Sequence, residues 1–136
     1  MREILFRGKG KISGDWWYGH FVPVITDAAL GTFQNIIIKK DDTGTVWIEV
    51  DPETVGQYTG LKDKHGRKIF EGDILRSLYD PDYPEDYIYE TVVWYQNAWS
   101  IKTAGYDSPP DPLTFDEEVL RYSEVYGNIF EDDKTK

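Results

Sequence analysis

The run Gln57–Leu75, QYTGLKDKHGRKIFEGDIL, decides the fold. The segments Gln57–Thr59 and Lys68–Phe70 have β character, and the turn residues of Asp63–Gly66 separate them. A kink at Glu71–Asp73 then introduces a further strand. Bends of this kind curl small sheets into barrels. The run therefore predicts a strand, a tight turn, a short strand, a kink and a strand, and its charges and glycines fit architecture better than catalysis.

Two glycines in this run are expected to have special backbone conformations. Gly66 stands where a tight turn favours positive φ, and Gly72 is placed to permit a bulge or a close backbone approach. If φ at Gly72 is positive, a β-branched side chain is rejected there. We therefore expect Gly72→Val to destabilise the fold strongly and Lys64→Ala, in the turn, to have little effect.

The N-terminal third is predicted to contain two strands joined by a glycine-rich turn. Arg2–Arg7 has a short β-prone centre, and the glycines of Gly8–Asp15 suit a flexible turn. The aromatic stretch Trp16–Ile25 follows. Because proline cannot donate to a sheet ladder, Pro23 either breaks this stretch or confines it to a sheet edge.

Two hairpins and a last strand complete the predicted β structure. Asn35–Lys39 and Thr45–Val50 are joined by a loop that ends at Gly44, and Tyr87–Tyr95 returns through Gln96-Asn97 as Ala98–Thr103. Ser123–Phe130 is expected to form the last strand. Their alternation of strands and tight turns is typical of a mainly β fold.

One short helix is predicted near the C-terminus. Thr114 and Glu117 have the capping-box spacing, so the helix should span Thr114–Tyr122. Two proline-rich loops, Tyr79–Asp86 and Gly105–Pro112, separate the preceding elements. The whole chain, residues 1–136, is expected to form a single domain whose charged tail, residues 131–136, frays.

The composition is that of an acidic, folded protein. The net charge is −10 with 40% hydrophobic and 15% aromatic residues, which is too rich in core-forming side chains for a disordered chain. No apolar run is long enough to span a bilayer, and residues Met1–Gly14 have neither an apolar core nor a small-residue cleavage site. The chain is therefore expected in the cytoplasm and without a membrane partner. With no cysteine there is no disulfide framework, no thiolate nucleophile and no cysteine-based zinc site.

The sequence offers no pattern typical of an enzyme. His20 follows an aromatic stretch and His65 lies in a turn, and neither has the neighbours of a catalytic triad or a zinc site. The acidic residues between positions 80 and 86 lack the mid-loop glycine of a calcium loop. Gly8-Lys9-Gly10-Lys11 is too short for a phosphate-binding loop. We therefore expect no catalytic residue, no metal and no cofactor.

Nucleic-acid binding remains an alternative, although the charge distribution argues against it. Up to Lys68 the chain has 10 basic and 9 acidic residues, and from Ile69 onward it has 5 basic and 16 acidic residues. Its two candidate features are a basic turn and a set of aromatic residues that suit either base stacking or packing. These residues are Lys62, Lys64, Arg67 and Lys68, and Trp16, Trp17, Tyr18, Trp94, Tyr95 and Trp99.

The stretch VGQYTGLKDKHGRKIFEGDIL, Val55–Leu75, resembles the signature of the YopX family, small proteins of phages and prophages. The start Arg2–Arg7 and the end Val125–Glu131 (VYGNIFE) resemble those of the family as well. The resemblance implies a small SH3-like β-barrel core around the EGDI strand, additional hairpins, a phage or prophage origin and homo-oligomers. It supplies no activity. The residues that carry the motif are Gln57, Tyr58, Thr59, Gly60, Leu61, Asp63, Gly66, Glu71, Gly72, Asp73, Ile74, Gly127 and Asn128.

Three functions are consistent with these features. The first is a non-catalytic phage or prophage accessory protein that acts through protein contacts with itself, the host or the phage. The second is an acidic mimic of DNA that occupies a host nucleic-acid-binding protein. The third is a small barrel that binds nucleic acid through its basic turn.

Overall fold

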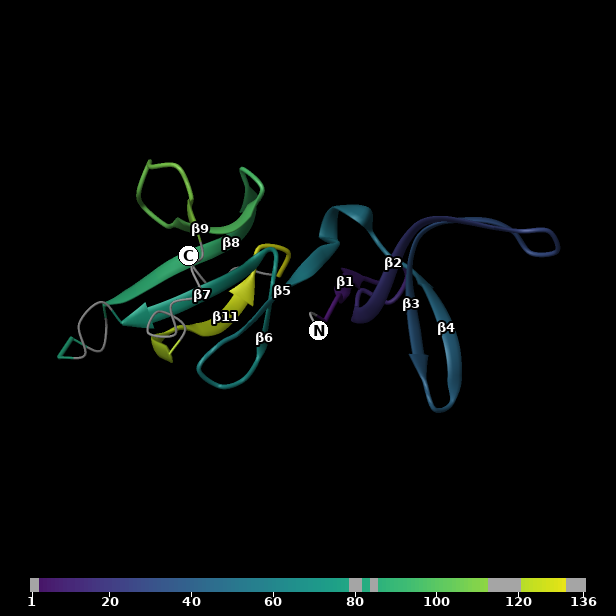
Figure 1. Cartoon of the computed structure of the whole chain (residues 1–136), viewed down its shortest axis with the longest axis horizontal. Coiled ribbons are helices and arrows are strands. Elements are labelled where there is room, and N and C mark those ends of the chain that lie inside the picture. The colour runs from purple at the N-terminus through teal and green to yellow at the C-terminus, as the bar shows by residue number, and fades with distance from the viewer. Residues whose placement is uncertain (1–2, 79–81, 84–85, 113–120, 132–136) are drawn as a thin grey trace. The chain divides into compact units, whose positions relative to one another are not determined.

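The structure, a computed structural model, describes residues 3–78, 82–83, 86–112 and 121–131. Within these residues the chain is mainly β and its strands pair antiparallel. The chain divides into two compact units, Met1–Tyr58 and Thr59–Lys136. The division falls inside strand β5 (Gly56–Lys62), which contributes residues to both units (Figure 1).

Unit 1, Met1–Tyr58, is built from four strands and the start of β5. The four are β1 (Phe6–Lys9), β2 (Trp16–Asp27), β3 (Gly31–Asp41) and β4 (Gly44–Glu49). They follow the order β4-β3-β2-β1, and β1 also pairs with the start of β5. An isolated bridge between Gly10 and Val50 connects the end of β4 with the chain that follows β1. A short 3₁₀ helix, η1 (Pro52–Thr54), leads into β5.

The core of unit 1 lies around the middle of β3. Ile36 and Ile37 are adjacent and fully buried, and because successive strand residues point to opposite faces, both faces of β3 are covered there. Val50 is also fully buried. It packs against Gly8, where an added Cβ would lie 2.9 Å from Val50 Cγ2. The absence of a side chain at Gly8 therefore permits this close packing.

The structure corrects two predictions for the N-terminal third. The first strand runs from Phe6 to Lys9 instead of Arg2 to Arg7, so Gly8 belongs to a strand and not to a flexible turn. β2 continues through Pro23 to Asp27. The predicted edge position of Pro23 is confirmed, because beyond Gly19 β2 pairs only with β3. Opposite Pro23, Asn35 takes a positive φ of 56° and the ladder skips one pair.

Both predicted hairpins are confirmed. The first is β3–β4, in which Asp41 pairs with Gly44 across a two-residue turn. Asp41 Oδ1 accepts hydrogen bonds from the hydroxyl and the N–H of Thr43, and these bonds hold the pKa of Asp41 below its usual value. The second is β8–β9, in which Gln96 and Asn97 both take positive φ, as a primed hairpin turn requires.

Unit 2, Thr59–Lys136, contains the end of β5 and six further strands. These are β6 (Lys68–Phe70), β7 (Asp73–Leu78), β8 (Tyr87–Tyr95), β9 (Ala98–Thr103), β10 (Asp111–Pro112) and β11 (Glu124–Asn128). The last five form a sheet in the order β10-β9-β8-β7-β11, and β6 pairs with β5. The core of unit 2 consists of Ile69, Leu75 and Val92 with four partly buried neighbours, Leu61, Trp99, Ile101 and Val125.

The structure contradicts one part of the predicted fold, and most of another part lies outside the described residues. Among the described residues the five-stranded sheet is open, with β10 and β11 at its two ends, so no SH3-like barrel closes around β7. At one edge of this sheet β10 has only two residues, Asp111 and Pro112, and pairs with β9. The predicted helix Thr114–Tyr122 lies outside the described residues except for Arg121 and Tyr122, and of the tail 131–136 only Glu131 is described.

The structure gives a physical basis for the expected effect of Gly72→Val. Gly72 has a φ of +89°, and an added Cβ would lie 3.1 Å from Cε2 of Phe130. Strain and crowding together should lower the free energy of unfolding by about 2–3 kcal/mol. Lys64→Ala is the control, because the main-chain bond from Lys64 N to Ser123 O is kept. Urea denaturation measures both variants, and equal midpoints would contradict the role given to Gly72.

Candidate interaction surface

An aromatic cavity opens on unit 1. Trp17 of β2 and Trp47 of β4 line it together with Ile12, Ile48 and Glu49, and its volume is about 250 Å³. Gly10 and Ser13 complete the lining. Trp17 Nε1 lies 3.5 Å from Ser13 Oγ, and the ring of Trp47 contacts Phe33 edge-on at 6.0 Å. The contact with Ser13 holds the indole of Trp17, and the contact with Phe33 holds that of Trp47.

Two apolar residues that line this cavity are exposed to solvent. Trp47 is 42% exposed. Ile12, at the rim, is fully exposed. Because a contiguous exposed apolar surface is a common mark of a protein contact site, we treat this surface of unit 1 as the candidate interaction surface.

Cations of unit 1 lie over tryptophan rings. The guanidinium of Arg7 is 4.8 Å from the centre of the Trp16 ring, and Lys9 Nζ lies 5.9 Å from the same ring. Lys39 Nζ lies 5.8 Å from the ring of Trp17. Contacts of this kind stabilise a cation by about 0.5–1 kcal/mol at exposed sites. They occupy ring faces on which nucleic-acid bases would stack.

The proposed stacking residues are divided between the two units. Trp16, Trp17 and Tyr18 belong to β2 of unit 1. Trp94, Tyr95 and Trp99 belong to β8 and β9 of unit 2, where Trp94 and Trp99 pack edge-on at 4.8 Å. Trp99 also packs against the core of unit 2. The six aromatic residues therefore do not form one stacking surface within either unit.

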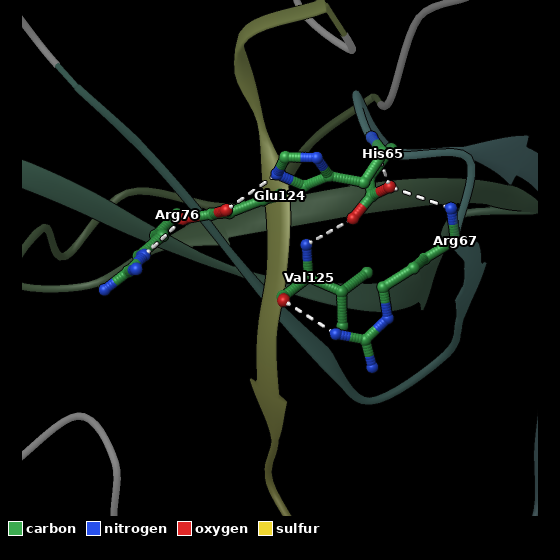
Figure 2. A network of polar contacts seen from close by, with 6 residues as sticks. His65, Arg67, Arg76, Glu124 and Val125 are labelled. Atoms are coloured by element: carbon green, nitrogen blue, oxygen red, sulfur yellow. Dashed lines mark hydrogen bonds and ion pairs between the residues drawn. The ribbon is translucent and has the colours of Figure 1, made fainter.

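The carboxylate of Asp63 organises the signature turn of unit 2. It is almost completely buried, and its Oδ1 accepts hydrogen bonds from the N–H groups of His65 and Arg67 at 2.9 Å. Its Oδ2 accepts the N–H of Val125 at 2.8 Å, and Arg67 Nη1 donates to the carbonyl of Val125 at 3.3 Å (Figure 2). Gly66 takes the predicted positive φ, +79°. The turn is thereby tied to β11.

A second polar contact joins β7, β11 and the same turn. Glu124 Oε1 accepts a hydrogen bond from Arg76 Nε at 2.6 Å, and His65 Nε2 lies 3.1 Å from Glu124 Oε2 (Figure 2). The Arg76 guanidinium also lies 4.4 Å from the ring of Tyr87 and 4.5 Å from that of Tyr126. The bond from Arg76, more than that from His65, holds the pKa of Glu124 below its usual value. Glu124 in turn raises the pKa of Arg76.

The kink and the C-terminal motif contact each other directly. Ile129 N donates to Gly72 O at 2.9 Å, and Asp73 pairs with Asn128 across β7 and β11. Asp73 Oδ2 accepts the N–H of Phe70 at 2.8 Å, and Asn128 Oδ1 accepts the N–H of Phe130 at 2.9 Å. Gly127 pairs with Ile74, and Glu71 immediately precedes Gly72. These residues therefore form the kink and its anchor.

The first signature residues form β5. Gln57 pairs with Phe6, and Tyr58, which is buried, donates its N–H to Leu5 O at 2.8 Å. Thr59 Oγ1 donates to Ile69 O at 2.8 Å and accepts the N–H of Leu61 at 3.1 Å. Gly60 between them has a φ of +90°. In the structure these signature residues lie in β5 and bond neighbouring strands.

The residues considered for catalysis or metal binding are dispersed. His20 is an exposed residue of β2, whereas His65 lies beside Glu124 in unit 2. Of the acidic loop, Asp80 and Glu85 lie outside the described residues, and Asp82 and Asp86 lie within them. In the part of the chain that the structure describes, no group of three His, Asp or Glu residues could hold a metal ion. Within the same residues, no helix has the length and apolarity to cross a membrane.

Unit 2 has an acidic cavity that sequence reasoning missed. Its volume is about 580 Å³, and Asp86, Glu90 and Asp111 line it with Tyr87 and Tyr106. Ile88, Thr103 and Ser108 complete the lining. Burial raises the pKa of the Glu90 carboxyl, and the charge of Asp111 adds to this effect. Since Asp86, immediately before β8, and Glu90, within it, are more than 20 positions from Asp111 in β10, only the fold brings these carboxylates together.

Comparison with known proteins identifies the family. The family model of the YopX protein matches residues 5–134, nearly the whole chain. The chain therefore belongs to the YopX family. No curated protein matches the sequence. The fold is similar to that of the crystal structure of protein EF1440 from Enterococcus faecalis, at 22% identity and a TM-score of 0.53, with 95% of this chain and 94% of that chain covered.

The pKa of Glu124 predicts a pH dependence of stability. Because its pKa is lower in the folded than in the unfolded chain, ionised Glu124 stabilises the fold at pH above about 4.5, and this contribution is lost as the pH falls through the folded value. Urea denaturation should therefore find the unfolding free energy of Glu124→Gln below that of the native chain near neutral pH. The two values should converge below pH 4. The exposed Glu53→Gln is the control, and a difference that stays constant with pH would contradict the assignment.

Proposed function

We propose that this protein is a non-catalytic phage or prophage accessory protein of the bacterial cytoplasm that acts through protein contacts and assembles with copies of itself. Its membership of the YopX family supports the phage setting. The observation that supports the proposal is the cavity of unit 1, whose lining includes the exposed residues Ile12 and Trp47. Such surfaces are buried in complexes more often than they remain exposed.

Charge favours unit 1 as the contact region. Unit 1 has six basic and eight acidic residues, whereas unit 2 has nine basic and 17 acidic residues. The stretch from Trp16 to Ile38 contains one formally charged residue, Asp27, although 29% of the chain is charged. Two copies with a net charge of −10 each repel one another, so contact is least opposed where charge is lowest.

The acidic cavity of unit 2 favours the DNA-mimic alternative as a second candidate. Asp86, Glu90 and Asp111 could receive a cationic side chain of a nucleic-acid-binding protein. Direct nucleic-acid binding has less support, because several cations have protein partners. Arg76 bonds Glu124, Lys11 lies 3.3 Å from Glu49, and Lys102 Nζ bonds the carbonyl of Ser108.

Light scattering of the native chain across the micromolar range tests self-assembly. We expect a mass that is a multiple of 15.8 kDa and that persists in high salt, because the proposed contacts are apolar. A monomer at every concentration would contradict self-assembly. A monomer that binds a purified host nucleic-acid-binding protein, with affinity lost in Glu90→Gln, would favour the DNA-mimic alternative instead.

A further inference from the structure

The outer end of the β2–β3 hairpin forms a two-stranded arm, residues 24–34. Four pairs build it, from Val24 with Gln34 to Asp27 with Gly31. Pairing with β1 ends at Gly19, and pairing with β4 reaches back only to Ile36. Figure 1 shows the hairpin tip extending past the end of β4. Among the described residues, the strands of the arm therefore pair only with each other.

The turn of the arm is well defined by its sequence. Asp27 Oδ1 accepts the N–H groups of Ala29 and Leu30, both at 2.8 Å. Gly31 completes the turn with a φ of +98°. An aspartate at the start of a turn and a glycine at its end are the usual devices for fixing it. The arm is thus a preformed element and not an irregular loop.

The arm exposes more apolar surface than a free two-stranded ribbon supports. Leu30 is 68% exposed and Val24 is 54% exposed, while Ile25 and Phe33 are half-buried. A two-stranded hairpin alone is marginally stable in water, and a third strand or a packed face is needed to stabilise it. A partner that pairs with the arm would supply a third strand and cover the exposed apolar side chains.

One edge of the arm is open to an added strand. Natural sheets protect their edges with lysine, proline or bulges. Pro23 stands at the base of the β2 edge, but Gly31–Gln34 (GTFQ) on the β3 edge contains none of these devices. Thr32 and Gln34 are exposed there. The β3 edge is therefore the one that accepts another strand.

The charge of the arm fits a second copy of the same chain. Asp27 is its one charged residue. If two β3 edges pair antiparallel, Gly31 of one copy lies opposite Gln34 of the other, and the two Asp27 residues stand at opposite ends. Four residues of strand separate them by roughly 10 Å or more, about one Debye length. The edge is thus complementary to itself.

From these features we infer that the arm pairs through the edge Gly31–Gln34 with the arm of a second copy. This inference rests on the proposed self-assembly and identifies its contact. Main-chain hydrogen bonds supply the register, and Val24, Leu30 and Phe33 are buried as the arms come together.

The test combines lysine substitutions with light scattering. Val24→Lys and Thr32→Lys place charge on the arm, and Ile4→Lys is the matched control because Ile4 is exposed and lies outside both the arm and the candidate interaction surface. We expect the arm variants to weaken assembly about tenfold or more and the control to leave it unchanged. Circular dichroism monitors the fold of each variant.

Single cysteines provide a readout that does not depend on weakened assembly. The native chain has no cysteine, so Thr32→Cys should give an oxidised dimer while Ile4→Cys stays monomeric on denaturing gels. A native oligomer that keeps its affinity in both arm lysine variants and gives no Thr32→Cys dimer would overturn the arm contact while leaving self-assembly intact. A native chain that is monomeric throughout would overturn both.

Discussion

Three main-chain N–H groups converge on the buried carboxylate of Asp63, and the arrangement of unit 2 depends on this contact. His65 and Arg67 donate from the turn, and Val125 donates from β11, 62 residues away. A buried carboxylate is stable only when hydrogen bonds replace its water. The same contact therefore fixes the turn and holds the last strand against it. The contact therefore links the signature turn to the C-terminal motif that begins at Val125.

From Asp63 onward, the described contacts of the signature residues lie within the fold of unit 2. Gly72, Asp73 and Asn128 bond the backbone or one another, and their side chains serve the kink and its anchor. The features that suit contact with a partner lie in unit 1, where Trp17 and Trp47 line a cavity and charge is sparse. Unit 2 differs in having most of the negative charge.

Local signals predicted much of the fold. The β3–β4 and β8–β9 hairpins, and the positive φ of Gly66 and Gly72, follow from turn residues within a few positions. The arm was missed because Ala28, Ala29 and Leu30 are not typical turn residues, and its signal lies only in the flanking Asp27 and Gly31. Of the two alternatives predicted for Pro23, the edge position is the one found, because a ladder tolerates proline where one edge is free.

Long-range contacts could not be predicted from a single sequence. Arg76 and Glu124 are 48 positions apart, and nothing local marks them as partners. The carboxylates of the acidic cavity likewise meet only after β8 and β9 have paired. The bends of Gln57–Leu75 suggested a barrel and the family resemblance suggested an SH3-like one, but the described sheet is open.

Hydrogen exchange of the native chain at low and high concentration tests the central claim, that the signature is architecture and the arm is the contact. The account predicts that exchange at Gly31–Gln34 slows as concentration rises, because new main-chain bonds form there. Exchange at His65, Arg67 and Val125, whose amides already bond Asp63, should not change. Slower exchange at the Asp63 turn, with the arm unchanged, would contradict the account.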